Sequence, residues 1–242
     1  MAVRQSIAKL IRSAAPRPLA GAIRRLGTFL DPHAKPSYSQ EGEDLILLRM
    51  FESNRPGFFI DVGAHHPQRF SNTFLFYRRG WRGINIDPSP EAIALFNAER
   101  PRDINLALGV SDEPGTLTYF VFDDPALNTF DEKLARERER TTAYRVTGTR
   151  QVQVARLDEL LARHLPPGQS IDVMSVDAEG YDFNVVRSND WSRFRPRYLL
   201  VECLASSLTN IAEQPMHKYL EDRRYRLFAK TVNTLFYASA DG

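Results

Sequence analysis

The chain has 242 residues, of which 43% are hydrophobic and 26% are charged, and its net charge at pH 7 is +2. These shares lie near the averages of globular proteins, so they exclude a disordered class and a fibrous class. Its one cysteine, Cys203, excludes an intrachain disulfide, a cysteine-based zinc site and a Cys-x-x-Cys redox pair.

Residues 1–36 form a basic segment with seven lysine or arginine residues and one acidic residue, Asp31. Apolar residues lie between the basic ones, which is typical of a helix that contacts anionic lipid or a partner at the inner membrane face. We favour the other interpretation, a leader that packs loosely or stays mobile. A folded domain is expected over residues 37–242. No apolar run approaches the roughly 18 to 20 residues of a membrane span, so we expect a cytoplasmic protein.

The first expected helix lies in SYSQEGEDLILLRMF, residues 37–51. Ser37 and Gln40 have the spacing of a capping box, and the acidic residues that follow suit the positive end of a helix dipole. The helix is expected to end before Asn54.

Short apolar runs alternate with helical patterns from residue 57 onward. The pattern predicts strands at 57–64, 83–87 and 103–109 and helices at 71–80 and 90–100. This alternation is typical of a parallel sheet with helices on its faces, and ligands of such sheets bind at the carboxyl ends of the strands.

The middle of the chain departs from the alternation. GTLTYFVF, residues 115–122, predicts a strand that follows directly on another, as in an antiparallel hairpin. Residues 131–150 are polar and highly charged without a clear apolar face, so we expect a surface lobe or a mobile loop there.

The alternation resumes toward the C-terminus. Strands are predicted at 150–157, 170–177, 197–204, 225–231 and 233–239, and helices at 158–165, 182–191 and 214–223. The sequence therefore predicts an α/β fold with a Rossmann-like sheet of about seven strands, mostly parallel with an antiparallel edge, flanked by helices.

Two strand ends carry candidate ligand-binding residues. FIDVGA ends the first strand with Asp61, and Gly63 behind it would let a ligand approach the backbone. Asp87 ends the second strand, where an acid typically holds a pair of ribose hydroxyls. The G-x-G-x-x-G spacing is missing, which counts against NAD or FAD.

Seven blocks of the chain together resemble the FkbM family of S-adenosylmethionine-dependent methyltransferases, over about Ser37 to Cys203. They are YSQEGED, FFIDVGAHHP, SNT, GWRGINIDPSPEA, ALGVSDEPGTLTYF, VARLDELL and SVDAEGYDFNVV, in this order. The resemblance implies the class I methyltransferase sheet, bound S-adenosylmethionine and, commonly, O-methylation of a sugar or natural-product hydroxyl.

The resemblance also implies which residues bind the cofactor. DVGA would be the cofactor loop, with Asp61, Gly63 and Ala64 near the methionine moiety and Asp87 on the ribose. Residues near the third strand would edge the adenine, and YSQEGED would close over the cofactor from the other side. The remaining expected contacts are Asn105, Ala107, Leu108, Gln40, Glu41 and Asp44.

Asp177 ends the strand SIDVMSVD, beside the expected position of the methyl sulfonium. Asp177 or Glu179 could remove the proton of the acceptor hydroxyl, and His65, rather than its neighbour His66, is a third candidate base. The alternative for Asp177 is a cap on the following helix.

A metal site is a further hypothesis. Asp177, Glu179 and Glu202 resemble the D-x-D and distal acid of metal-dependent macrolide-sugar O-methyltransferases, and three oxygen donors at neighbouring strand ends suit Mg²⁺. The alternative for Glu202 is an ion pair with a nearby arginine.

We therefore expect an S-adenosylmethionine-dependent O-methyltransferase that acts on a sugar, glycan, lipid-linked sugar or natural product. Its expected partner is such an acceptor and not a nucleic acid, and residues 123–150 with the final helix are expected to shape the acceptor pocket. The alternatives are a nucleotide-sugar or dinucleotide oxidoreductase and a non-catalytic nucleotide-binding module. The oligomeric state is left open.

Overall fold

The computed structural model describes residues 33–51, 55–204 and 206–240. The chain divides into two compact units, Met1–Ser37 and Tyr38–Gly242. Nearly all of the expected basic leader, residues 1–32, lies outside the described residues, so its contact with a membrane or a partner stays a prediction. In the described part of the chain, every helix is too short or too polar to cross a bilayer.

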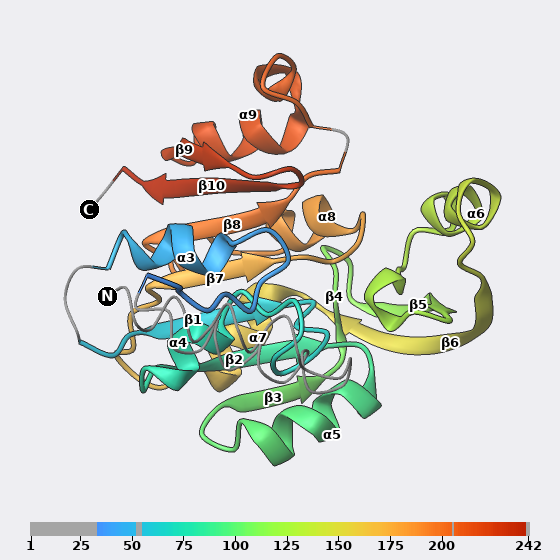
Figure 1. The fold of residues 1–242 in the computed structure, drawn as a ribbon, viewed down its shortest axis with the longest axis horizontal. Coiled ribbons are helices and arrows are strands. Elements are labelled where there is room, and N and C mark those ends of the chain that lie inside the picture. The colour runs from blue at the N-terminus through green and yellow to red at the C-terminus, as the bar shows by residue number, and fades with distance from the viewer. Residues whose placement is uncertain (1–32, 52–54, 205, 241–242) are drawn as a thin grey trace, which may run out of the picture. The chain divides into compact units, whose positions relative to one another are not determined.

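Seven strands form the main sheet of the second unit (Figure 1). The first five in spatial order run parallel, and β10 lies antiparallel to both of its neighbours, which confirms the predicted architecture. In spatial order the strands are β3 (Ile104–Ala107), β2 (Arg82–Asp87), β1 (Phe58–Val62), β7 (Val173–Val176), β8 (Tyr198–Glu202), β10 (Thr234–Ser239) and β9 (Tyr225–Lys230).

Helices cover both faces of this sheet because its strands are apolar on both faces. Along β1, Ile60 packs in the cluster of α7, α8 and α9, whereas Phe59 packs in the cluster of α3 and α4. Successive strand side chains point to opposite faces, which produces this division. The helices are α3 (Glu43–Leu48), α4 (Phe74–Arg78), α5 (Pro90–Glu99), α7 (Leu157–His164), α8 (Asp182–Arg187) and α9 (Pro215–Asp222), with a 3₁₀ turn η2 (Ile211–Glu213) before α9.

A second sheet of three strands belongs to a lobe that we define as residues 109–155. Its strands lie in the order β4 (Gly109–Val110), β6 (Val146–Ala155) and β5 (Gly115–Phe122), and β5 pairs antiparallel with β6. The lobe also holds the 3₁₀ turn η1 (Pro125–Leu127) and the helix α6 (Glu132–Thr141). Figure 1 shows α6 and the β5–β6 ribbon to one side of the main sheet.

Of the two alternatives for residues 131–150, a surface lobe or a mobile loop, the structure shows the lobe, with the helix α6 and the start of β6 in it. Asp131 accepts hydrogen bonds from the backbone N–H groups of Lys133 and Leu134 and so caps α6. Ala135 is buried against the aromatic residues Phe120 and Phe122 of β5. The helix forms because a cap and one narrow apolar strip suffice when a sheet lies beside it.

The helix expected from residue 37 begins later, so the proposed capping box of Ser37 and Gln40 is wrong. α3 begins at Glu43 after Gly42, whose φ is 87°. Asp44 explains the shift, because its carboxylate accepts hydrogen bonds from the Tyr38 N–H and the Ser39 hydroxyl. The segment before α3 is thereby held as a turn.

Candidate functional site

A cavity opens at the carboxyl ends of β1, β2 and β7 and encloses about 710 Å³, its open mouth included. The lobe contributes Tyr119, Asn128 and Phe130 to the wall, together with η1. From the segment 123–150 the lining includes Pro125, Ala126, Asn128 and Phe130, and it includes no residue of α9. The part of either segment in an acceptor pocket stays a prediction.

Asp87 ends β2 on the wall of the cavity and is buried. Its two carboxylate oxygens accept the backbone N–H groups of His65 and Ser89, each at 2.8 Å. Burial raises the pKa of Asp87 to about 6, although both backbone hydrogen bonds lower it. The carboxylate is thus ionised at neutral pH, and each oxygen keeps a lone pair for a ligand hydroxyl.

Gly63 also lines the cavity, and it explains how β1 and β7 lie so close at their ends. Its φ is 76°, and a Cβ atom there would stand 1.7 Å from the carbonyl oxygen of Asp177. The sequence predicted that a ligand would approach this glycine. The structure shows that the backbone of Asp177 already requires a glycine at this position without any ligand.

Asp61 lies behind the cavity wall and does not line it, although cofactor contact was expected of it. Its carboxylate accepts a hydrogen bond of 2.6 Å from the Thr73 hydroxyl. Burial raises the pKa of Asp61, while Thr73 and the Arg100 guanidinium lower it. Asp61 therefore holds the segment before α4 against β1.

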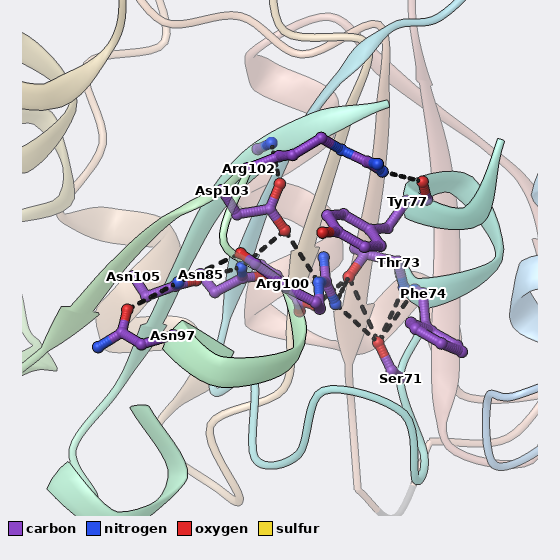
Figure 2. Close-up of polar contacts among 12 residues, drawn as sticks. Ser71, Thr73, Phe74, Tyr77, Asn85, Asn97, Arg100, Arg102, Asp103 and Asn105 are labelled. Atoms are coloured by element: carbon purple, nitrogen blue, oxygen red, sulfur yellow. Dashed lines mark hydrogen bonds and ion pairs between the residues drawn. The ribbon is translucent and has the colours of Figure 1, made fainter. Parts of the chain in front are cut away.

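Arg100 is the centre of a buried polar network (Figure 2), and Thr73 connects this network to Asp61. The guanidinium forms an ion pair of 2.9 Å with Asp103, and both side chains are 0% exposed. It also donates to the hydroxyls of Thr73 and Ser71, on its other side in Figure 2. A buried charge of this kind is tolerated because it is paired and hydrogen-bonded.

Aromatic rings and amides complete the surroundings of Arg100. The rings of Phe59, Tyr77 and Phe96 lie 5.0 to 5.1 Å from its guanidinium carbon. Asn85 donates to Asp103 and to Asn105, which itself donates to Asn97, as the chain of contacts in Figure 2 shows. Asn105 was expected at the adenine, but in the structure it links β2 and β3 behind the cavity.

His65 projects into the cavity from a strained backbone, with a φ of 53°. Its ring stacks on Phe70, and its Nε2 atom is buried without a hydrogen-bond partner in the part of the chain that the structure describes. Burial, and then the positive charge of Arg69, lowers the pKa of His65 to about 4, so the imidazole is neutral at pH 7. Its neighbour His66 instead accepts two backbone N–H groups and holds the turn.

An ion pair joins the His65 loop to the lobe. Both terminal nitrogens of Arg69 donate to the carboxylate of Asp124, at 3.1 and 3.2 Å. Asp124 also caps η1, whose residues line the cavity. The loop and the lobe therefore close over the cavity together.

Glu179 lines the cavity from a left-handed backbone, with a φ of 51°, as His65 and Phe70 do. Its carboxylate forms an ion pair with Arg138 of α6, and its carbonyl accepts the hydroxyl of Thr129. Burial raises the pKa of Glu179, and Arg138 lowers it. Glu179 thus connects the lobe to the end of β7.

The structure brings together a different set of acids from the predicted metal ligands. Asp177, Asp182 and Glu202 offer carboxylate oxygens that all lie within 4.8 Å of one another. Glu179 is paired with Arg138 instead. Asp182 accepts the N–H groups of Ala178 and Gly180 and so holds the turn before α8. The alternative for Asp177, a cap on the following helix, is wrong, because α8 begins after Tyr181 without a side-chain cap.

Some of the other residues expected to contact the cofactor line the cavity, and others do not. Gln40 and Leu108 line the cavity. The described lining leaves out Glu41, Asp44, Ala64 and Ala107. Their contact with a cofactor stays a prediction.

The chain matches the family model described as Methyltransferase FkbM domain over residues 61–227, which is more than half of its length. It is also similar to the crystal structure of Methyltransferase FkbM from Methylobacillus flagellatus KT, with 12% sequence identity and a TM-score of 0.49. That match covers 83% of this chain and 48% of the other, so the chain spans about half the length of that protein. The curated proteins contain no match.

Proposed function

The chain belongs to the Methyltransferase FkbM domain family, and from this membership we propose that it is an S-adenosylmethionine-dependent O-methyltransferase. Its acceptor would be a hydroxyl group of a sugar, a glycan, a lipid-linked sugar or a natural product. The observation that carries the proposal is the cavity with Asp87 and Asp177 on its wall.

The cavity suits the parts of S-adenosylmethionine. Asp87 and Asp177 end strands on either side of β1, which puts their backbones about 10 Å apart, at roughly 4.8 Å per strand. Asp87 offers acceptors for the ribose diol, and the apolar side chains of Ile86, Leu108 and Val110 offer a surface for the adenine. Asp177 offers negative charge for the sulfonium.

When it is bound, S-adenosylmethionine supplies a methyl group on positively charged sulfur. In the transfer, the acceptor oxygen bonds to the methyl carbon, the carbon–sulfur bond breaks, and its electron pair stays on sulfur as a neutral thioether. The hydroxyl proton must leave the acceptor oxygen. The residues of the chain align the two reactants, which is worth about 7 to 11 kcal/mol in well-oriented cases, and accept the proton.

Asp177 is the base that we favour. It lines the cavity, and its Oδ1 atom is buried and finds no hydrogen-bond partner within residues 33–51, 55–204 and 206–240. Burial and the carboxylates of Glu179 and Asp182 raise the pKa of Asp177 well above its ordinary value. Its ionised form therefore needs positive charge nearby, which the sulfonium supplies. His65 has a free Nε2 in the same cavity and is the second candidate.

Aromatic side chains on the cavity wall, most of them from the lobe, support a sugar or natural-product acceptor. Tyr119, Phe130 and Phe70 bring aromatic rings to the cavity wall. Such side chains can pack against the apolar face of a ring in the acceptor. Asn128 adds an amide to this side of the cavity.

Titration calorimetry with S-adenosylhomocysteine, followed by a screen with tritiated S-adenosylmethionine over sugar and lipid-linked acceptors, tests the proposal. We expect binding of one molecule per chain and transfer of label to a hydroxyl-bearing acceptor. An absence of binding would contradict the proposal. Binding without transfer to any acceptor would favour the non-catalytic binding module.

A further inference from the structure

Three acids meet where β7, β8 and α8 come together. Asp177 follows β7, Glu202 ends β8, and Asp182 begins α8. One carboxylate oxygen of each lies within 4.8 Å of the others. β7 and β8 are parallel neighbours, so their carboxyl ends lie at the same edge of the sheet.

Two oxygens in this cluster have no partner among the described residues. Oδ1 of Asp177 and Oε2 of Glu202 are buried and accept no hydrogen bond from that part of the chain, and Glu202 as a residue is only 7% exposed. A buried carboxylate without a partner is costly, so such atoms point to a proton or a cation that the chain itself does not supply.

The basic side chains of the described residues do not neutralise the cluster. Arg138 is the nearest candidate, and its guanidinium is already engaged with Glu179 and with the carbonyl of Leu127. The alternative considered for Glu202, an ion pair with an arginine, is therefore not what the structure shows. Three acids at this separation repel one another, and burial with this repulsion raises the pKa of Glu202 to about 11.

We propose that Asp177, Asp182 and Glu202 bind a hard divalent cation, Ca²⁺, Mn²⁺ or Mg²⁺, at the wall of the cavity. Carboxylate oxygens are the ligands that these ions prefer. Ca²⁺ binds oxygens at about 2.3 to 2.6 Å, so two of its ligands can stand up to about 5 Å apart. The observed separations suit Ca²⁺ as they are, and Mg²⁺ would draw the oxygens closer.

Asp182 shows that the cluster is held in place before any ion binds. The N–H groups of Ala178 and Gly180 donate to its two oxygens at 2.7 and 3.0 Å, which fixes the carboxylate and leaves a lone pair on each oxygen. Hydrogen bonds of this kind orient the ligands in metal sites.

The role of the cation site in catalysis rests on the proposed methyl transfer. A cation beside Asp177 would stabilise the ionised form of its carboxylate. Asp177 belongs both to the acidic cluster and to the cavity wall. Cation binding itself requires neither S-adenosylmethionine nor an acceptor, so the two proposals can fail separately.

The test uses the full chain after treatment with EDTA and dialysis. CaCl₂, MnCl₂ and MgCl₂ are titrated by calorimetry up to about 10 mM, above the weakest dissociation constants of roughly 10⁻³ M for protein calcium sites. We expect one site per chain and a rise in the melting temperature on adding the ion. Glu202→Gln should weaken binding more than tenfold, and Glu159→Gln, at an exposed position on α7, should leave it unchanged.

If none of the three ions gives heat or shifts the melting temperature, shared protons hold the cluster and the proposal is wrong. Equal affinity of Glu202→Gln and the unchanged chain would also overturn it. Asp177→Asn serves as the second variant if Glu202→Gln does not fold. Titration of S-adenosylhomocysteine into the EDTA-treated protein reports on the proposed function independently.

Discussion

A methyl group on Gly63 would stand 1.7 Å from the carbonyl oxygen of Asp177. The turn after β1 and the end of β7 therefore cross at a distance that only glycine allows, and this crossing builds one wall of the cavity. The φ of 76° at Gly63 adds a second reason for glycine.

The first prediction is that Gly63→Ala lowers the free energy of unfolding by about 2 to 5 kcal/mol, the sum of overpacking and left-handed strain. Urea unfolding followed by circular dichroism measures the change. Gly148→Ala is the matched control, because a Cβ at Gly148 meets nothing within 4 Å and its backbone is not left-handed. A loss below about 1 kcal/mol for Gly63→Ala would show that the crossing relaxes easily.

The second prediction concerns the buried pair of Arg100 and Asp103. Arg100→Met leaves an unpaired buried carboxylate and should cost about 3 to 5 kcal/mol of unfolding free energy. Arg136→Met breaks ion pairs of an arginine side chain that is 63% exposed and should cost less than about 1 kcal/mol. Adding Asp103→Asn to Arg100→Met should recover part of the loss, and an additive loss would argue against direct coupling.

The third prediction is a pH dependence of nucleoside binding. The pKa of Asp87 is about 6 in the folded chain and near 3.8 in the unfolded chain. Between these two pH values the carboxyl is therefore protonated in the folded chain and ionised in the unfolded one. The contribution of Asp87 to stability is therefore present at low pH and lost as the pH rises from about 4 to 6. Ribose binding needs the ionised form and should strengthen over the pH range in which Asp87 ionises.

Calorimetry with S-adenosylhomocysteine from pH 5 to pH 7.5 measures this effect. Affinity should rise by up to roughly tenfold per pH unit below the pKa. Asp87→Asn should bind about 10- to 100-fold more weakly, as expected for losing a hydrogen bond to a charged group, and should lose this pH dependence. A variant with the pH profile of the unchanged chain would show that another group titrates.

The fourth prediction separates catalysis from binding. Asp177→Asn should lower kcat about 10²- to 10⁴-fold, the usual contribution of a general base, while the dissociation constant of S-adenosylhomocysteine changes little. Asp222→Asn, at an exposed position on α9, is the control and should keep full activity. If Asp177→Asn retains its kcat, the base is His65 or another group, and the family membership is unaffected.

The parallel sheet could be predicted from the sequence because each of its strands is a short apolar run bounded by turn residues. The strand predicted at 150–157 covers only the second half of β6, because most residues of β6 are exposed and 23 residues separate β6 from its partner β5. Polar strands of this kind form because a neighbouring strand supplies their hydrogen bonds. Local composition does not reveal that neighbour.

The acidic strand ends could also be predicted, but the direction of each side chain could not. Glu179 lies three residues before Asp182, which begins α8. A left-handed backbone at Glu179 and Gly180 turns Glu179 toward Arg138, whereas Asp182 stays in the cluster. Arg100 was missed because arginine is usually exposed. Its burial depends on Asp103 and on aromatic rings from β1 and α4.

The most direct measurement of the central claim is a crystal structure of the chain with S-adenosylhomocysteine. Our account predicts that the ribose hydroxyls lie within hydrogen-bond distance of Asp87 and that the sulfur faces Asp177 across the end of β1. A nucleoside bound elsewhere on the chain, or bound here with its ribose away from Asp87, would contradict it.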